Sequence, residues 1–312
     1  MNNTKKMPKI ALGAWAWGMD GTFGDTYTVD SLKPVYDLAM EKGLNLWDTA
    51  FVYGMGTSEK ILGELMKDTP KDEVIISTKF TPQCDDGTPE TMQHMINGSK
   101  ERLGVDVIDI YWIHNPMDVE KYTPMIATLA KSGQIRQIGV SNHSLAEIKR
   151  AEEILAKEGL KISAVQNHFS ILNRSSEKSG ILDYCKEKGM EFYSYMVLEQ
   201  GALGGKYSSS NLFPEGSDRA KTYNPMMSQI DELIAVMKEI ADKHDASVAQ
   251  IATAWAIGKK TLPIIGVTKV EQVEDAAKSA SIELSEEEIR KMENKADELG
   301  LSTIRYWEKE MK

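Results

Sequence analysis

Four polar residues of this chain have side chains that could share one proton-transfer step: Asp48, Tyr53, Lys79 and His114. Each ends or closely follows a short apolar run that predicts a β-strand. A tyrosine phenol is a weak acid with a pKa of about 10, and a nearby lysine ammonium stabilises the phenolate and lowers that pKa. An aspartate beside the lysine would keep the lysine charged. These residue types together indicate a tuned proton donor.

A repeated pattern indicates the elements that position these residues. Helix-like stretches end in Glu/Lys-rich residues, continue with a glycine and lead into a short apolar run, at Gly43, Gly133, Gly159 and Gly189. Glycine takes the left-handed backbone conformation that ends a helix, and lysine there suits the negative end of the helix dipole. The runs that follow are rich in β-branched and aromatic residues, as buried parallel strands are. The chain therefore alternates helices and strands.

Eight strands are predicted, near residues 9–12, 44–47, 74–78, 108–113, 135–140, 164–166, 192–195 and 262–265. This alternation favours a (β/α)8 TIM barrel of the α/β class. A doubly wound open sheet is the alternative, weakened because no GxGxxG motif follows the first strand. No Pro/Gly/Ser-rich linker interrupts the chain, so we expect a single domain over residues 1–312. It would carry a long loop at about 207–226, and a C-terminal helix and tail at about 285–312 that reaches the catalytic face.

Several spaced motifs resemble those of the aldo-keto reductase family. They run in order from about Gly13 to Asp275: Trp47-Asp48-Thr49-Ala50-x-x-Tyr53-Gly54, Lys79, His114, Gly139-Val140-Ser141-Asn142, Gln166 and Gln200-Gly201-Ala202-Leu203-Gly204-Gly205-Lys206-Tyr207. The resemblance implies a barrel that uses a nicotinamide dinucleotide and interconverts carbonyls and alcohols. We therefore predict an enzyme, an NADP(H)-dependent oxidoreductase that reversibly reduces an aldehyde or ketone.

The resemblance also implies a role for each of the four residues. Tyr53 would be the general acid that protonates the carbonyl oxygen as hydride reaches the carbon. Lys79 would lower the pKa of Tyr53, with Asp48 paired to Lys79. His114 would hydrogen-bond the carbonyl oxygen and stabilise its developing negative charge.

Two glycine-containing loops favour a cofactor site. Barrels often bind phosphate with the loops after strands seven and eight, which here contain Gly201, Gly204 and Gly205, and then Gly266. Backbone N–H groups in such loops can cradle a pyrophosphate. By resemblance, Ser141, Asn142 and Gln166 would hold the nicotinamide carboxamide, and Tyr195 would stack on the ring. The full predicted cofactor set is Ser141, Asn142, Gln166, Tyr195, Val197, Leu198, Gln200, Gly201, Leu203, Lys206, Gly266, Val267, Thr268, Lys269, Gln272 and Asp275.

The chain departs from the family pattern in these loops. Tyr195-Met196-Val197-Leu198 stands where the family has Tyr-Ser-Pro-Leu, and Gln272 and Ala276 stand where it usually has arginine and asparagine. A basic group distinguishes a 2′-phosphate from a bare ribose. Lys269, with Thr268, still offers such a group, so we predict NADPH as the cofactor and leave NADH open.

Residues near the strand ends are candidates to contact the substrate: Trp15, Trp17, Phe51, Phe80 and Asn115. Aromatic walls with a few polar groups suit a small ligand. Trp112 lies inside a predicted strand and is expected in the core.

The composition argues against other kinds of partner. The net charge of −10 disfavours nucleic acid and anionic membranes, since both need a basic face, and no run of about 18 apolar residues occurs. Cys84 and Cys185 form no CxxC pair and are typical of free thiols, so we expect a cytoplasmic protein. The histidine spacing predicts no metal site. The expected partner is a small carbonyl or alcohol, and the oligomeric state is left open.

Two other functions fit part of the pattern. A nicotinamide-binding regulatory subunit with little turnover would keep the cofactor residues and associate with a membrane partner. A different barrel enzyme would use Lys79 to form a Schiff base. The presence of all four catalytic residues favours the reductase. The physiological substrate and the direction of the reaction stay open.

Overall fold

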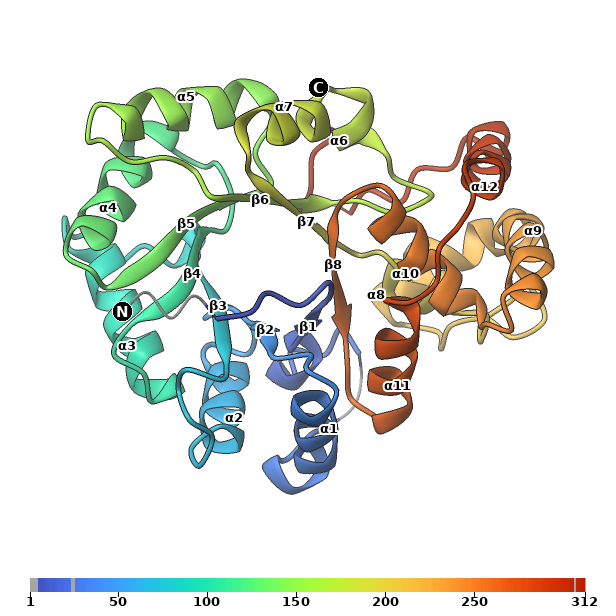
Figure 1. Cartoon of the computed structure of the whole chain (residues 1–312), viewed down its shortest axis with the longest axis horizontal. Helices are drawn as coiled ribbons and strands as arrows, with labels where there is room; N and C mark the ends of the chain where they lie inside the picture. Colours follow the sequence, from blue (N-terminus) through green and yellow to red (C-terminus); the bar gives the residue numbers. More distant parts are fainter. Residues whose placement is uncertain (1–4, 24–25, 306, 312) are drawn as a thin grey trace.

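Eight parallel strands close into a barrel in chain order, with β8 paired to β1 (Figure 1). The computed structural model describes residues 5–23, 26–305 and 307–311. The predicted (β/α)8 barrel is confirmed, and its closure excludes the open doubly wound sheet. The strands are β1 (Ala11–Gly13), β2 (Leu46–Asp48), β3 (Ile75–Phe80), β4 (Ile108–Ile113), β5 (Ile135–Ser141), β6 (Ala164–His168), β7 (Glu191–Tyr195) and β8 (Leu262–Gly266).

Helices surround the barrel (Figure 1). Local sequence explains several of their ends: Ser144 and Ser285 each exchange hydrogen bonds with a glutamate three residues later, and Gly189 closes a helix in the left-handed conformation. The helices are α1 (Val29–Glu41), α2 (Thr57–Leu65), α3 (Thr91–Leu103), α4 (Val119–Lys131), α5 (Leu145–Ala156), α6 (Ser175–Lys178), α7 (Ile181–Lys188), α8 (Asp218–Tyr223), α9 (Met227–Lys243), α10 (Val248–Gly258), α11 (Val270–Ser279) and α12 (Glu286–Leu299).

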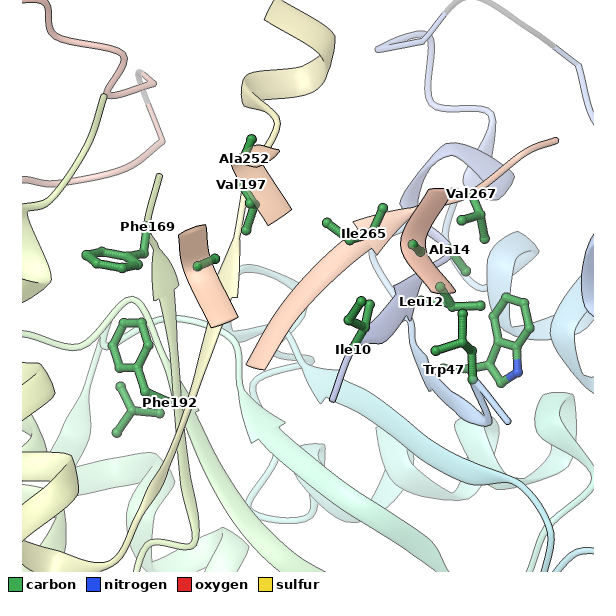
Figure 2. Close-up of a cluster of buried hydrophobic side chains, with 14 of the residues drawn as sticks. Ile10, Leu12, Ala14, Trp47, Phe169, Phe192, Val197, Ala252, Ile265 and Val267 are labelled. Carbon is green, nitrogen blue, oxygen red and sulfur yellow. The ribbon is translucent and has the colours of Figure 1, made fainter. Parts of the chain in front are cut away.

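The larger part of the core lies between the strands and the surrounding helices. Figure 2 shows some of its side chains, with Phe169 and Phe192 on one side and Leu12 and Trp47 on the other. Phe169 also stacks on Trp255 of α10, with ring centroids 5.0 Å apart. Since successive strand residues face opposite sides, the residues next to these point into the barrel.

The barrel interior is filled below its carboxyl end. Trp112 is fully buried, as predicted, and lies across Gly139 of the next strand. A Cβ on Gly139 would stand 2.5 Å from Trp112 Cδ2, so only glycine leaves room for the indole. Polar residues of the site therefore lie above a packed floor, as is usual in this kind of barrel. The interior cluster consists of Ala11, Leu46, Ile75, Ile110, Trp112, Ala164, Tyr193 and Leu262.

The segment predicted as a long loop at 207–226 contains short helices. Ser217 accepts a hydrogen bond from the Ala220 N–H and thereby begins α8, and a 3-10 turn, η4 (Asn224–Met226), follows. The first part of the same connection holds another 3-10 segment, η3 (Glu199–Gly204), directly after β7.

The C-terminal tail returns to the barrel after α12. Thr303 donates to the Glu199 carboxylate, and Lys309 donates to Glu147 of α5. The tail therefore reaches the carboxyl end of the barrel, as predicted. Within the described part of the chain, no helix combines the length and apolar character needed to cross a membrane.

Candidate active site

The site is built from inward-facing positions at the carboxyl ends of the strands. In β3, Ile75 belongs to the interior cluster, and Ser77 and Lys79 follow it at intervals of two. Neighbouring strands repeat this alternation, because a strand directs every second side chain to the same face. It brings to the inner face Asp48, His114, Ser141, Gln166, His168 and Tyr195.

The Lys79 ammonium lies at the centre of the site. Its Nζ donates to Asp48 Oδ1 at 2.5 Å, to the Thr49 carbonyl at 2.8 Å and to the Tyr53 hydroxyl at 3.2 Å. The Lys79 side chain is fully buried and that of Asp48 is 5% exposed. Asp48, Lys79 and Tyr53 therefore form one connected group.

A second set of contacts orients Asp48. Its Oδ2 accepts from Ser77 Oγ at 2.6 Å and from Gln166 Nε2 at 3.1 Å. Ser77 Oγ in turn accepts from Trp112 Nε1 at 2.7 Å. Because Oδ2 is occupied by these donors, Oδ1 is held toward Lys79. The buried floor of the barrel thus positions the ion pair.

Burial and charge act in opposite directions on the two central groups. Burial raises the pKa of the Tyr53 phenol; the Lys79 ammonium lowers it by less, so the pKa lies above its ordinary value. For Lys79, burial lowers the pKa, and the Asp48 carboxylate with Tyr53 more than offsets this. The predicted direction of the lysine effect is present, but the net lowering of the Tyr53 pKa is corrected, since desolvation outweighs it.

His114, directly after β4, faces Tyr53, with ring centroids 6.0 Å apart and planes at 80°. The Thr81 hydroxyl lies 3.2 Å from His114 Nδ1, and Asn142 Nδ2 donates to the His114 carbonyl at 2.9 Å. Burial, together with the Lys79 ammonium, lowers the pKa of His114 well below its usual range. The imidazole is therefore neutral at pH 7, where it can donate one hydrogen bond and accept another.

The predicted nicotinamide residues lie next to His114. Asn142 has a left-handed backbone (φ 61°), and its Oδ1 lies 2.5 Å from the Tyr195 hydroxyl. Ser141 Oγ lies 3.3 Å from Asn142 Nδ2. Gln166 reaches the same region through Asp48. The structure thus brings all four of these residues to one wall of the barrel end.

The connection between β7 and β8 carries two buried donor atoms with no partner in the described part of the chain, Gln200 Nε2 in η3 and Arg219 Nε in α8. The Arg219 guanidinium lies 5.2–6.0 Å from the rings of Phe23, Tyr207 and Phe213. Buried donors without partners are costly. A ligand with acceptor oxygens would satisfy them, so these residues fit an anionic group such as a pyrophosphate.

The remaining predicted cofactor residues lie in different surroundings. Val197, Leu203 and Val267 bury their side chains in the core, so only their backbone is available to a ligand. Gln272 Oε1 accepts from the N–H groups of Thr268 and Lys269 at the start of α11. Positions that the structure leaves at least partly open are Leu198, Gly201, Lys206, Gly266, Thr268, Lys269, Gln272 and Asp275.

Comparison with known proteins decides the family. The sequence model of the Aldo/keto reductase family matches residues 9–297. The chain belongs to this family. Pyridoxal reductase, chloroplastic, of Arabidopsis thaliana is 31% identical over 313 residues, 95% of this chain and 85% of that protein. The aldo-keto reductase yakc of Schizosaccharomyces pombe, named for NADP(+), is 27% identical over 315 residues, 95% of this chain and 91% of that protein.

A solved structure shows the same fold. The glycerol dehydrogenase from Gluconobacter oxydans superposes with a TM-score of 0.83 at 24% identity, over 98% of this chain and 97% of that one. Membership in the aldo/keto reductase family supports an oxidoreductase with carbonyl reductase activity in general.

Only part of the predicted substrate wall lies at the mouth of this aldo/keto reductase. Trp15 stacks on Tyr53 with ring centroids 5.9 Å apart. Asn115 donates to Gln83 at 2.6 Å and is half-buried. Trp17 and Phe80 are fully buried in the core, so their expected contact with substrate is corrected.

Phe51 is also directed to another partner. The Arg102 guanidinium lies 5.0 Å from its ring centroid, and Arg102 itself pairs with the buried Glu59. Phe51 therefore packs toward α3 while it stays partly exposed, and its contact with substrate stays a prediction. The physical reason for these corrections is that aromatic side chains beside a strand end serve the outer core as readily as the mouth.

Several residues of the site were not predicted from the sequence. Ser77 and Trp112 orient Asp48, and their positions, two residues from Lys79 and His114, are the signal that could have revealed them. Thr81 and His168 carry the same signal, since they lie two residues after Lys79 and Gln166. Glu308, in the C-terminal tail, gave no comparable pattern. In the described ranges of the chain, no group of three or more His, Cys, Asp or Glu side chains could hold a metal ion.

Proposed function

We propose that the protein reduces an aldehyde or ketone to an alcohol, with Tyr53 as general acid and NADPH as cofactor. The observation that carries the proposal is the buried ammonium of Lys79, 2.5 Å from Asp48 Oδ1 and 3.2 Å from the Tyr53 hydroxyl. Fold stability does not explain this buried ion pair, since such a pair adds little stability over apolar residues of similar size. It suits a hydroxyl that must release a proton.

The proton step follows from these contacts. Tyr53 remains protonated before the reaction because burial raises its pKa, and it donates to the carbonyl oxygen. The phenolate that results lies beside Lys79, whose charge is maintained by Asp48. The ammonium therefore stabilises the charge that appears only as the proton leaves, and this lowers the barrier rather than the energy of the bound substrate.

His114 orients the substrate in this proposal. If the Thr81 hydroxyl donates to Nδ1, the neutral ring carries its proton on Nε2 and can donate to the carbonyl oxygen. Tyr53 and His114 then supply two donors to the same oxygen. Trp15, stacked on Tyr53, offers an apolar surface against which a small carbonyl compound would pack.

The chain's residues fit a nicotinamide dinucleotide, which supplies a hydride when bound. Ser141, Asn142 and Gln166 would hold the carboxamide and Tyr195 the ring. Gln200, Arg219 and the backbone around Gly201 and Gly266 would hold the pyrophosphate, which the unpartnered Gln200 Nε2 and Arg219 Nε support. A relative named for NADP(+) supports NADPH.

The experiment compares wild type with Tyr53→Phe in NADPH oxidation with a nitrobenzaldehyde. We expect kcat to fall about 10²-fold or more, with the Kd for NADPH unchanged by fluorescence titration. Full turnover in Tyr53→Phe would contradict the role of Tyr53. A wild type that binds NADPH without turnover and co-purifies with a large partner would favour the regulatory subunit.

Cofactor preference is tested through Lys269. This exposed lysine is the basic group near the start of α11. Lys269→Ala should raise the KM for NADPH about tenfold, because a charge-assisted contact with the 2′-phosphate is lost. The KM for NADH, which lacks that phosphate, serves as the control and should not change. A wild type that clearly prefers NADH would contradict the choice of NADPH.

The cytoplasmic location that the sequence suggests stays a prediction.

A further inference from the structure

A buried histidine outside the catalytic group links the C-terminal tail to the nicotinamide wall. His168, at the end of β6, is 3% exposed. Its Nε2 lies 2.8 Å from Glu199 Oε1 and its Nδ1 lies 2.9 Å from Glu308 Oε2. Both ring nitrogens therefore face carboxylate oxygens, which accept but do not donate when ionised. With both carboxylates ionised, this geometry places a proton on each nitrogen, in agreement with the His168 pKa, which burial lowers but the two glutamates raise to about 10.

The two carboxylates have different surroundings. Glu199 is fully buried and also accepts from Ser170, Tyr223 and Thr303. The hydrogen bonds that Glu199 accepts therefore do not depend on Glu308. Glu308 accepts from the Arg305 N–H at 2.9 Å and, through Oε1, from the Tyr195 hydroxyl at 2.8 Å. Glu308 is thus the member of the pair that reaches the predicted nicotinamide site.

Tyr195 is held on two sides by this arrangement. Its ring stacks on His168, with centroids 5.7 Å apart and planes at 28°. Its hydroxyl lies between Glu308 Oε1 and Asn142 Oδ1. A stack on a cation and a bond to a carboxylate fix the ring more firmly than apolar packing does.

Neighbouring tail residues contact the same region. Arg305 donates to Gln200 Oε1 at 2.8 Å, from a nearly buried position between the rings of Tyr223 and Trp307. Trp307 meets Trp15 edge-on at 6.1 Å. The tail thus contacts the cofactor loop and both walls of the mouth.

We propose that Glu308 is a positioning residue for the nicotinamide ring: it couples the tail to His168 and fixes the orientation of Tyr195. The inference rests on the proposed function, because Tyr195 is the residue placed there against the nicotinamide. It assigns to the tail a part in cofactor binding.

The experiment is a double-mutant cycle of Glu308→Gln and Tyr195→Phe, read as the Kd for NADPH. Glu308→Gln keeps the shape but removes the charge, and we expect binding about tenfold weaker, since the bonds of Tyr195 and His168 to a charged group are replaced by weaker contacts with a neutral amide. Tyr195→Phe removes the hydroxyl through which Glu308 acts. The effects of the two changes on the Kd for NADPH should therefore be non-additive. The double variant should bind NADPH about as weakly as the single variant that binds it less well.

A control and a second readout separate positioning from general loosening of the tail. Lys309→Ala removes the neighbouring ion pair with Glu147, 2.6 Å in length and on the surface, and should leave the Kd unchanged. NMR of the cofactor-free protein should show His168 protonated to about pH 10 in the wild type and titrating at lower pH in Glu308→Gln. Additive effects, or an unchanged Kd in Glu308→Gln, would overturn the role of Glu308. A wild type that binds neither NADPH nor NADH would contradict the proposed function instead.

Discussion

At the scale of single residues, Asp48 and Lys79 form an ion pair almost without contact with water. Taking two charges out of water is expensive, and their attraction repays that cost only while both partners are present. Lys33 and Asp37 form the opposite kind of pair, at 2.5 Å on the exposed surface of α1, with both side chains more than half exposed. The chain therefore contains a matched comparison for the effect of burial.

We expect Asp48→Asn to lower the free energy of unfolding by about 3–5 kcal/mol, because it leaves a buried ammonium without its counter-charge. It should also reduce kcat, since the lysine charge beside Tyr53 is no longer maintained. Asp37→Asn should cost less than about 1 kcal/mol. Urea unfolding of both variants measures the difference. Equal costs would mean that Lys79 gains little from Asp48.

At the scale of elements, the loops after β1 and β2 touch at two glycines beside Tyr53. A Cβ on Gly54 would overlap the Gly18 carbonyl, with the carbonyl carbon 2.8 Å away. Gly54 also has a positive φ of 64°. Gly18 is equally constrained, since its Cβ would stand 2.5 Å from the Tyr53 carbonyl carbon. This close approach fixes where the Tyr53 backbone lies relative to the barrel.

Gly54→Ala should therefore destabilise the protein by about 3 kcal/mol or more, through overpacking as well as backbone strain. It should also lower kcat by displacing the Tyr53 hydroxyl from Lys79. Gly43→Ala is the control, because Gly43 has a φ of 72° but nothing within 4 Å of its Cβ. That variant should cost about 1 kcal/mol with normal kcat. If both variants behave alike, the contact between the loops is unimportant for the site.

At the scale of the whole molecule, buried histidines make stability depend on pH in two directions. Burial lowers the pKa of His143 to about 4 and that of His114 well below 6.5. The unfolded chain then binds more protons at acid pH, so this stability is present above pH 6.5 and is lost as the pH falls. For His168, burial lowers the pKa, but Glu199 and Glu308 raise it to about 10. That stability is present below pH 6.5 and is lost as the pH rises toward 10.

The free energy of unfolding should consequently be greatest near pH 6.5 and fall on both sides. Denaturant unfolding at about pH 5, 6.5 and 9 measures this profile. His168→Gln should flatten the alkaline side only, and His143→Gln the acid side only, so each variant is the control for the other. If the free energy of unfolding of His168→Gln still falls as steeply above pH 6.5 as that of the wild type, His168 is not held as an imidazolium in the fold.

The sequence by itself determined the eight strands and the order of the motifs at their ends. Both are local properties: a strand needs only a short apolar run, and its period of two directs Asp48, Lys79 and Gln166 to the same side. Once the strands close into a barrel, residues that end different strands must meet. The Asp48–Lys79 pair followed from this alone, whereas the place of Tyr53 depends on the loop after β2.

Only the tertiary structure decided which aromatic residues face the mouth and how the charges balance. Trp17 carries the same signals as Trp15, but long-range packing buries it. Phe80 directly follows the inward-facing Lys79 in β3, so strand alternation alone turns it toward the outer core. The net pKa of Tyr53 depends on how completely neighbouring chain removes it from water, which no spacing encodes. Glu308 meets His168 across 140 residues of sequence, and such a contact exists only because the folded barrel and α12 bring the tail back over the strand ends.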